Sequence, residues 1–301
     1  KYSPYEVKSE KPKRWLKFLD EIFAGDNEVV DYVHKILGYS ITESAREQCA
    51  FVLLGDGSNG KSVLLEIANK AIGSYGGTSD SNALLQKRGQ KENLGDIARL
   101  NRLRMVITSE TNYGDKLDES IIKTLTSGIE PIVARFLYGT EFEFIPKFKI
   151  LMATNHKPII RGTDNGIWRR MRTIPFNVTF NKNQQDKDLI LKLNEEMPAI
   201  LNWLIQGCLK WQKEGLDKIP KAIEDADKEY RSDMDLVQRW LDECCEIDES
   251  YSEKSLDLFN NLCNYISINK EFQISNTLFG MNMGKKFKKR RYGGATHYIG
   301  L

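Results

Sequence analysis

The stretch Cys49-Ala50-Phe51-Val52-Leu53-Leu54-Gly55-Asp56-Gly57-Ser58-Asn59-Gly60-Lys61-Ser62 decides the fold class of this chain. Its first six residues form a short apolar run that ends at a glycine, which is typical of a buried parallel strand. Its last eight residues fit the pattern G-x-x-x-x-G-K-[ST], and a helical pattern over residues 63–72 follows directly. Strand, glycine-rich loop and helix in this order predict a phosphate-binding loop. A glycine-rich turn without a ligand is the alternative.

Each residue type in this loop has a physical role in binding a nucleotide. Glycines let successive backbone N–H groups turn toward phosphate oxygens, and the N-terminus of the following helix adds its dipole. We expect Lys61 to reach the β- and γ-phosphates and the hydroxyl of Ser62 to contact Mg²⁺. The predicted nucleotide-binding residues are Gly55, Asp56, Gly57, Ser58, Asn59, Gly60, Lys61 and Ser62.

Two further apolar runs, residues 103–108 and 148–154, predict strands, and helical patterns lie between the runs. This alternation predicts an α/β domain with a mostly parallel sheet. Asn155 comes directly after the second run and Glu110 two residues after the first, at the strand ends where open α/β sheets bind ligands. We expect Glu110 to orient and deprotonate the attacking water, and Asn155 to contact that water and the γ-phosphate. A solvent-facing carboxylate and an ordinary Asn turn are the alternatives.

A basic cluster, Trp168-Arg169-Arg170-Met171-Arg172, follows the predicted strands. An arginine that stabilises transition-state charge can come from the same chain or from a neighbour. Arg169 and Arg170 are therefore catalytic candidates, and a surface basic patch is the alternative.

The flanking segments are predicted to be mainly helical. Residues 12–38 and 184–215 carry apolar residues at helical spacing, and Gly38 is placed as a C-cap. Residues 224–257 are strongly acidic, which indicates a solvated connector and the first helix of a last domain.

The end of the chain is basic. We expect a helix ending in basic residues, a Gly293-Gly294 turn and a short strand, and the cations would neutralise nucleic-acid phosphates. A solvated helix face is the alternative. The candidate DNA-binding cations are Lys285, Lys286, Lys288, Lys289, Arg290 and Arg291.

Composition excludes several classes of protein. The 301 residues include 44 Lys+Arg and 42 Asp+Glu, a net charge of +2, which excludes a disordered polyelectrolyte and a uniformly basic DNA binder. Five cysteines without paired zinc-site spacing and three histidines argue against a metal cluster and indicate a reduced, cytoplasmic protein. No stretch is long and apolar enough for a membrane helix. The absence of an initial Met and of a signal region suggests a fragment of a longer chain.

Residues 12–180 resemble the superfamily-3 helicase module of phage, plasmid and poxvirus-type primase–helicases, which are hexameric ring ATPases of the AAA+ type. The resemblance rests on an ordered set of motifs. They are Trp15-x-x-Phe18-Leu19, Leu37-Gly38-Tyr39, the phosphate loop, Ser109-Glu110-Thr111, Lys123-Thr124-Leu125-Thr126-Ser127-Gly128, Ala134-Arg135, Ala153-Thr154-Asn155-His156-Lys157-Pro158, Gly166-Ile167-Trp168-Arg169-Arg170 and Ile174-Pro175-Phe176.

The resemblance implies ATP- and Mg²⁺-driven unwinding or translocation by a homo-oligomeric, hexameric ring on single-stranded and forked DNA. It assigns Lys61 and Ser62 to the phosphates and Mg²⁺. Glu110 is assigned to hydrolysis, with contact to Mg²⁺ through water, and Asn155 to sensing. Arg169 or Arg170 becomes the finger that reaches the neighbouring subunit's site. A primase or polymerase domain is expected upstream in the full-length chain, and no membrane partner is expected.

The family also places a β-hairpin before the sensor strand, and residues 132–144 match it. The tip lacks the expected lysine, so Arg135, Tyr138 and Lys147 are the candidate DNA contacts. An exposed hairpin tyrosine that packs across the strands is the alternative for Tyr138. A second departure is Ser109, which stands where many AAA+ proteins have the first of two adjacent acids.

Four segments follow from this interpretation. They are an N-terminal helical segment (1–45), an AAA+-like phosphate-loop core (46–180), a helical connector or lid (181–225) and a winged-helix-like DNA-binding domain (226–301). Two other functions stay open: an AAA+ ATPase that loads or remodels proteins without unwinding DNA, and an origin-binding initiator with a vestigial ATPase. The complete set of Lys61, Glu110, Asn155 and the arginine pair argues against the second.

Overall fold

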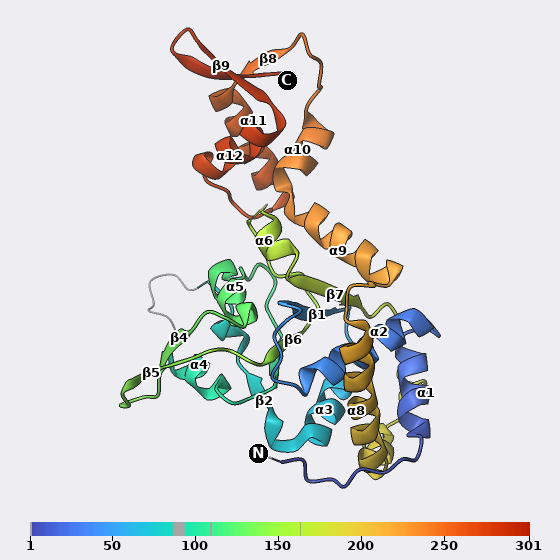
Figure 1. The fold of residues 1–301 in the computed structure, drawn as a ribbon. Helices are drawn as coiled ribbons and strands as arrows, with labels where there is room; N and C mark the ends of the chain where they lie inside the picture. Colours follow the sequence, from blue (N-terminus) through green and yellow to red (C-terminus); the bar gives the residue numbers. More distant parts are fainter. Residues whose placement is uncertain (1, 87–93, 109, 163) are drawn as a thin grey trace. The chain divides into compact units, whose positions relative to one another are not determined.

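The computed structural model describes residues 2–86, 94–108, 110–162 and 164–301 (Figure 1). The chain divides into two compact units, Lys1–Lys228 and Glu229–Leu301. In the first unit one apolar core draws on residues from Trp15 to Ile223, so its N-terminal, central and later helical segments pack together. Within the described ranges no helix is long and apolar enough to cross a bilayer.

The first unit is built on a parallel sheet with the strand order β2-β3-β6-β1-β7. The strands are β1 (Ala50–Leu54), β2 (Gly76–Ser79), β3 (Met105–Thr108), β6 (Lys149–Thr154) and β7 (Met171–Pro175). The predicted α/β class with a mostly parallel sheet is confirmed, and β1, β3 and β6 are the three predicted apolar runs. All six residues of β6 are buried, as expected for a strand covered on both faces.

Two strands of this sheet were not predicted. β2 has the sequence Gly-Gly-Thr-Ser and lies at an edge, so it needs no apolar pattern. β7 contains Arg172 and ends at Pro175, which disguised it within the basic cluster. Edge strands are partly exposed, and this weakens the hydrophobic signal that identifies central strands.

Helices cover the sheet of the first unit (Figure 1). They are α1 (Lys13–Ile22), α2 (Asn27–Ser40), α3 (Lys61–Ile72), α4 (Leu94–Leu100), α5 (Glu119–Ser127), α6 (Asn165–Trp168), α7 (Leu189–Glu195) and α8 (Met197–Glu214), with 3₁₀ turns at Gly73–Tyr75 and Ser81–Ala83. Helix α9 (Lys221–Met234) begins in the first unit and ends in the second. The helical predictions for residues 12–38 and 184–215 are confirmed, each as two helices.

Gly38 lies inside α2, so its predicted role as a C-cap is wrong. A Cβ atom on Gly38 would lie 2.1 Å from the backbone nitrogen of Cys208 in α8. From the other side, a Cβ on Gly207 would lie 2.3 Å from the carbonyl oxygen of His34. The two helices touch backbone to backbone, and this close approach, rather than a turn, explains the glycine.

The predicted hairpin at residues 132–144 is present as β4 (Ile132–Arg135) and β5 (Glu141–Phe144). The strands pair antiparallel with Arg135 opposite Glu141. Tyr138 has a φ of 60° in the connecting turn. Ala134 packs with Ile97 and Ala98 of α4, so a small apolar cluster supports the hairpin.

The second unit packs α10 (Leu236–Cys244), α11 (Ser255–Asn269) and α12 (Asn276–Lys286) with the antiparallel sheet β8-β10-β9. The strands are β8 (Ser252–Lys254), β9 (Lys288–Tyr292) and β10 (Ala295–Ile299). Its own core includes Trp240, Phe279 and Tyr298. This unit has a hydrophobic centre independent of the parallel sheet.

The expected helix with a basic end, the Gly293-Gly294 turn and the short strand are present, but most of the basic run lies in a strand that was not predicted. α12 ends at Lys286, and residues 288–292 form β9. Gly293 and Gly294 both have positive φ, 59° and 77°, which makes a two-residue hairpin turn that leads directly into β10. Pairing with β10 holds residues 288–292 in an extended strand instead of a helix.

Candidate nucleotide-binding site

The phosphate loop connects the end of β1 to the start of α3. Gly57, Ser58 and Gly60 have positive φ angles of 92°, 47° and 88°, so the chain turns sharply between strand and helix. A Cβ on Gly60 would lie 2.6 Å from Cγ2 of Ile22, which means that α1 packs directly on the loop. Glycine at position 60 is required by both its φ angle and this contact.

Lys61 lies at the centre of the site and is 3% exposed. Its Nζ donates hydrogen bonds to the carbonyl oxygen of Gly55 (2.5 Å), to Oδ1 of Asn59 (3.0 Å) and to Oδ1 of Asn155 (3.1 Å). Burial lowers the pKa of Lys61, and the nearby carboxylates of Glu110 and Asp56 act in the opposite direction.

Asn155 connects Lys61 to Glu110. Its Nδ2 lies 3.4 Å from each carboxylate oxygen of Glu110, whose side chain is exposed. The three residues follow β1, β6 and β3, which are adjacent parallel strands, so their ends meet at one edge of the sheet. The order of the strands in the sheet therefore brings the three predicted residues together. Ser109 lies outside the described residues.

A pair of threonines holds the strand ends in place. The hydroxyls of Thr111 and Thr154 lie 2.8 Å apart, and Thr154 also contacts the carbonyl oxygen of His156 at 2.8 Å. Thr154 is fully buried. The hydroxyl pair links the segment after β3, which carries Glu110, to the last residue of β6, which precedes Asn155.

The loop has the chemistry that a polyphosphate requires. Asn59 is 2% exposed, and in the described part of the chain its Nδ2 has no hydrogen-bond acceptor. The first N–H groups of α3 lack intrahelical acceptors, as in any helix, and Ser62 is exposed in the first turn. Buried donors around one lysine fit an anion, and the exposed hydroxyl fits a cation bound beside it.

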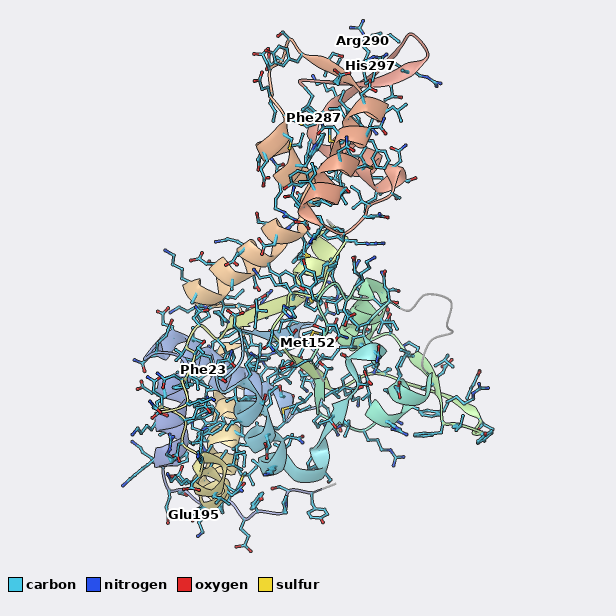
Figure 2. All side chains as sticks on the ribbon, turned by 180° about the vertical axis from the view of Figure 1, so that it is seen from behind. Phe23, Met152, Glu195, Phe287, Arg290 and His297 are labelled. Carbon is cyan, nitrogen blue, oxygen red and sulfur yellow. The ribbon has the colours of Figure 1, made fainter. Side chains whose placement is uncertain are left out.

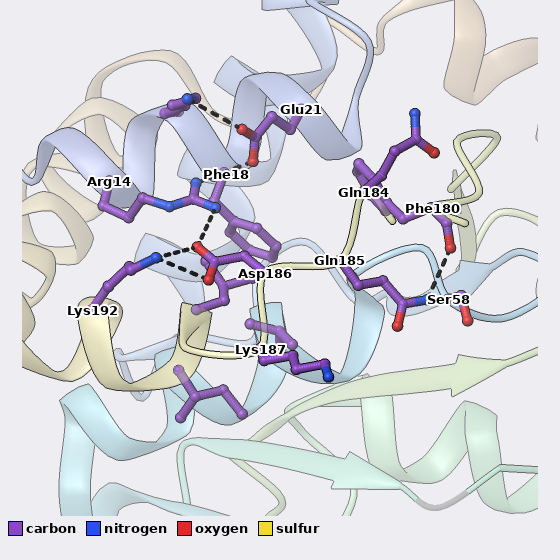
Figure 3. A pocket seen from close by; sticks show the side chains of 15 residues that line it. Arg14, Phe18, Glu21, Ser58, Phe180, Gln184, Gln185, Asp186, Lys187 and Lys192 are labelled. Carbon is purple, nitrogen blue, oxygen red and sulfur yellow. Dashed lines mark hydrogen bonds and ion pairs between the residues drawn. The ribbon is translucent and has the colours of Figure 1, made fainter. Parts of the chain in front are cut away.

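A cavity of about 840 Å³ lies beside the loop at Ser58, Gly60 and Val63 (Figure 3). Phe18 of α1 and Phe180 supply aromatic walls, and the backbone N–H of Phe180 donates to the carbonyl oxygen of Ser58 at 2.9 Å. The polar rim consists of Arg14, Lys17, Glu21, Gln184, Gln185, Asp186, Lys187 and Lys192. A cavity with aromatic walls next to a phosphate loop suits the base and sugar of a nucleotide.

Sequence reasoning missed this cavity because its walls come from three distant segments. Asp186 organises one side, with its carboxylate 2.8 Å from Lys192 and 3.7 Å from Arg14. These contacts join α7 to α1 (Figure 3). They connect residues far apart in the chain, so no local sequence pattern predicts them. The available signal was indirect, namely the polar run 181–188 that follows Phe180.

Arg169 and Arg170 lie near the start of β1, whereas Lys61 lies beyond its end. The backbone N–H of Ala50, the first residue of β1, donates to the carbonyl oxygen of Arg170 at 2.7 Å. The phosphate loop begins only after Leu54, which is about 13 Å further along the strand. Neither arginine is therefore positioned for the phosphate loop of its own chain.

Arg169 and Arg170 have different surroundings. Arg170 is half-buried and donates to the carbonyl oxygen of Gly166 at 2.6 Å, which is a structural contact. Arg169 is exposed, and its Nη2 donates to Oε1 of Gln48 at 3.3 Å. Because its side chain is exposed, Arg169 is the better candidate for contact with a second molecule.

The backbone beside Arg169 is held by Arg172 and Asp227. Nη1 of Arg172 donates to the carbonyl oxygen of Arg169 at 3.2 Å and lies 3.9 Å from Asp227 on α9. Asp227 also accepts a hydrogen bond from the N–H of Thr173 at 2.6 Å. Burial raises the pKa of Asp227 to about 6, against the favourable hydrogen bonds.

The predicted DNA contacts of the first unit separate into free and engaged groups. Tyr138, at the hairpin tip, is 98% exposed, and its neighbour Leu137 is 83% exposed. Lys147 pairs with Glu43 at 2.9 Å, whereas Arg135 is exposed and stands opposite Glu141 only in the strand register. The hairpin tip is thus apolar rather than strongly basic.

The basic residues of the second unit also separate. Lys286 pairs with Asp235 at 3.1 Å, and Lys289 donates to the carbonyl oxygen of Gly280 at 2.9 Å. Lys288, Arg290 and Arg291 have exposed side chains. The six candidates are therefore not equivalent.

Comparison with known proteins gives similarity to replication proteins of large DNA viruses. Residues 53–170 match a family model described as "Family of unknown function (DUF5906)". The chain is 27% identical over 282 residues to a "Putative helicase" of Acanthamoeba polyphaga mimivirus, covering 87% of this chain and 29% of that protein. It is 24% identical over 261 residues to a "Putative primase" of African swine fever virus, covering 80% of this chain and 27% of that protein.

The chain thus spans less than a third of the length of these relatives. Among solved structures, the apo structure of the NrS-1 C-terminal region is similar in fold, with a TM-score of 0.56 and 13% identity. That similarity covers 99% of this chain and 78% of the other. Sequence and fold comparisons both extend beyond the parallel sheet to most of the chain.

Proposed function

We propose that this chain is a superfamily-3 helicase module of the AAA+ type, which hydrolyses ATP to move along single-stranded DNA. The observation that carries the proposal is the hydrogen-bonded row Lys61–Asn155–Glu110 at the ends of three adjacent parallel strands. The similarity to viral proteins named as helicases and primases supports a role in DNA replication.

The residues of the row have distinct roles in this proposal. Lys61 exchanges its contacts with Gly55, Asn59 and Asn155 for phosphate oxygens, which its buried position makes favourable. Glu110 accepts the proton of the attacking water, because its exposed carboxylate lies at the same sheet edge. Asn155 keeps the carboxylate aimed at the water without itself changing charge.

Mg²⁺, when bound with ATP, would neutralise charge on the phosphate oxygens. The residues that would hold it are Ser62, through its hydroxyl, and Glu110, through water. The cavity beside the loop would receive adenosine, with Phe18 and Phe180 as its aromatic walls. The protein then supplies orientation and charge, and the nucleotide supplies the energy.

Arg169 would stabilise the transition state in a neighbouring copy of the chain. Its place near the start of β1, whereas Lys61 lies beyond the end of that strand, supports action in trans. A ring is the closed assembly that gives every site the same neighbour, and the family resemblance suggests six subunits. Arg170 would support the local fold instead.

DNA would meet both units of the chain. The hairpin β4–β5 would face single-stranded DNA in the ring, with Tyr138 and Arg135 as contacts. The second unit would be a winged-helix-like domain, which is supported by its three helices and its antiparallel sheet with a basic hairpin. A primase or polymerase domain in the full-length protein and a cytoplasmic location complete the proposal.

A strand-displacement assay on forked DNA, with particle size measured on the same sample, tests the function. ATP-dependent unwinding by an oligomer, lost in Lys61→Ala, is the expected result. ATP hydrolysis without unwinding would favour a loader or remodelling ATPase. Duplex binding without hydrolysis would favour an origin-binding initiator with a vestigial site.

A further inference from the structure

The sheet β8-β10-β9 has one face toward the helices of its unit and one face away from them. Tyr298 marks the helix side, since it is 1% exposed and its ring contacts that of Phe279 with 6.2 Å between centroids. Lys289 lies over the Tyr298 ring at 5.6 Å, on the same side. Because side chains alternate along a strand, Lys288, Arg290 and Tyr292 point to the opposite face.

The pairing register assembles a set of residues on that opposite face. His297 is opposite Arg290 on one side and Lys254 on the other, and Ile299 is opposite Lys288. Glu253 is opposite Tyr298 and so belongs to the helix side. We call the set Lys254, Lys288, Arg290, Tyr292 and His297 the Tyr292 face. Figure 2 labels two of its members, Arg290 and His297.

Tyr292 and His297 form a stacked pair of rings at the centre of the Tyr292 face. Their centroids are 3.7 Å apart and their planes differ by 14°. His297 is 5% exposed, whereas Tyr292 is 48% exposed, so the stack is closed on one side and open on the other. The hydroxyl of Tyr292 lies 3.1 Å from Oγ of Ser252, which fixes the ring.

Three cations surround this stack. Lys254, Lys288 and Arg290 are exposed, and in the described part of the chain none has an ion-pair partner within 4.0 Å. This distinguishes them from Lys286 and Lys289, whose amino groups already have protein partners. No carboxylate of the sheet lies on the Tyr292 face, so its charge is purely positive.

We propose that the Tyr292 face binds single-stranded nucleic acid, with an unpaired base stacked on Tyr292 and the flanking phosphates at the three cations. An exposed ring that already rests on a second ring is a rigid stacking platform, and cations beside it suit a phosphate backbone. Bases inside a duplex are covered by their neighbours, so the ligand must offer an unpaired base. The site adds to the proposed function a second single-strand contact outside the ATPase unit.

Binding of labelled oligonucleotides to the full chain without ATP tests this inference. Fluorescence anisotropy would compare oligo(dT) with an abasic strand of the same length, in a Tyr138→Ala background that removes the hairpin tyrosine. Tyr292→Ala should weaken binding of oligo(dT) by about tenfold, a typical loss for one stacked base, and leave the abasic strand unchanged. Tyr292→Phe retains the ring and should bind both strands like its parent.

Arg290 and Arg291 provide a matched pair for the phosphate contacts. They are adjacent and carry the same charge, but they point to opposite faces of β9. Arg290→Ala should weaken both oligonucleotides and lower the salt dependence by about one unit of slope. Arg291→Ala should weaken the binding of both oligonucleotides less than Arg290→Ala does.

Equal effects of Arg290→Ala and Arg291→Ala, or an equal effect of Tyr292→Ala on the two strands, would overturn the proposal. A Tyr292→Ala variant that loses binding to a duplex of the same length, but not to oligo(dT), would overturn it as well. Thermal melting of Tyr292→Ala and Tyr292→Phe shows whether each variant is folded. A folded Tyr292→Ala that loses binding, beside a Tyr292→Phe that keeps it, assigns the loss to the missing ring. Since no ATP is present, failure here leaves the ATPase proposal standing, and failure of the ATPase leaves this site standing.

Discussion

Asn155 accepts a hydrogen bond from Lys61, with 3.1 Å between Oδ1 and Nζ, although 94 positions separate the two residues in the chain. The contact exists because β6 lies next to β1 and both strands end at the same edge of the sheet. An amide is neutral at every ordinary pH. It therefore bridges a cation and a carboxylate without transferring a proton between them.

Glu110→Gln is expected to separate nucleotide binding from hydrolysis. The variant keeps the size of the side chain but loses the base, so turnover should fall by about 10²–10⁴-fold while ATP affinity changes little. Phosphate release and titration with a fluorescent ATP analogue measure the two properties. Glu66→Gln, an exposed glutamate of α3 that pairs with Lys70, is the control. Wild-type turnover in Glu110→Gln would exclude Glu110 as the base.

Arg169→Ala and Arg170→Ala are expected to fail in different ways. Arg169 is exposed, so Arg169→Ala should fold normally and should reduce the activity of mixtures with wild type more steeply than its share of the subunits. Arg170→Ala loses the hydrogen bond to Gly166 and should lower stability by about 1–3 kcal/mol. ATPase assays of mixtures and thermal melting distinguish them. Strictly proportional loss in the Arg169→Ala mixtures would contradict action in trans.

Filling the cavity beside the phosphate loop should raise KM for ATP. Ile190 lines the cavity, whereas its neighbour Leu191 is 63% exposed and outside it. Ile190→Trp should therefore raise KM about tenfold or more with little change in kcat, because the loss is of uniform binding. Leu191→Trp is the control. Identical kinetics of the two variants would show that the cavity does not receive the nucleotide.

Asp227 makes stability depend on pH in a defined direction. Burial raises its pKa from 3.8 to about 6, so the native state holds the proton more tightly than the unfolded chain. Its stabilising contribution is present below pH 4 and is lost as the pH rises through 6. Asp227→Asn keeps an acceptor for Thr173 and avoids this loss, which amounts to at most about 3 kcal/mol.

The expected result is that the melting temperature of Asp227→Asn gains on that of wild type as the pH rises from about 4 to about 7. Asp225→Asn, on an exposed position of α9, should show no such trend. A difference between Asp227→Asn and wild type that stays constant over this range would contradict the raised pKa.

Much of the central fold was predictable because its signals are local. The apolar runs of β1, β3 and β6 are short and continuous, and the loop between β1 and α3 has a defined glycine pattern. Once these strands are known to be parallel, their ends must share an edge. The proximity of Lys61, Glu110 and Asn155 then follows from strand order.

Other features depend on contacts between distant segments. Gly38 has the local appearance of a helix end, but the approach of α8 places it inside α2. The strand β9 resembles a basic helix end until β10 pairs with it. The cavity at Ser58 needs α1 and residues 180–192 together. In each case tertiary packing decided the outcome, and local propensity did not.

The most direct test of the central claim is the ATPase activity of wild type beside that of Lys61→Ala. Lys61 is buried among the loop oxygens and Asn155, so Lys61→Ala removes an ammonium from the centre of the site. Steady-state phosphate release should be measurable for wild type and should fall by at least about 100-fold for a folded Lys61→Ala. Equal turnover of the two proteins would show that this loop is not the site of ATP hydrolysis.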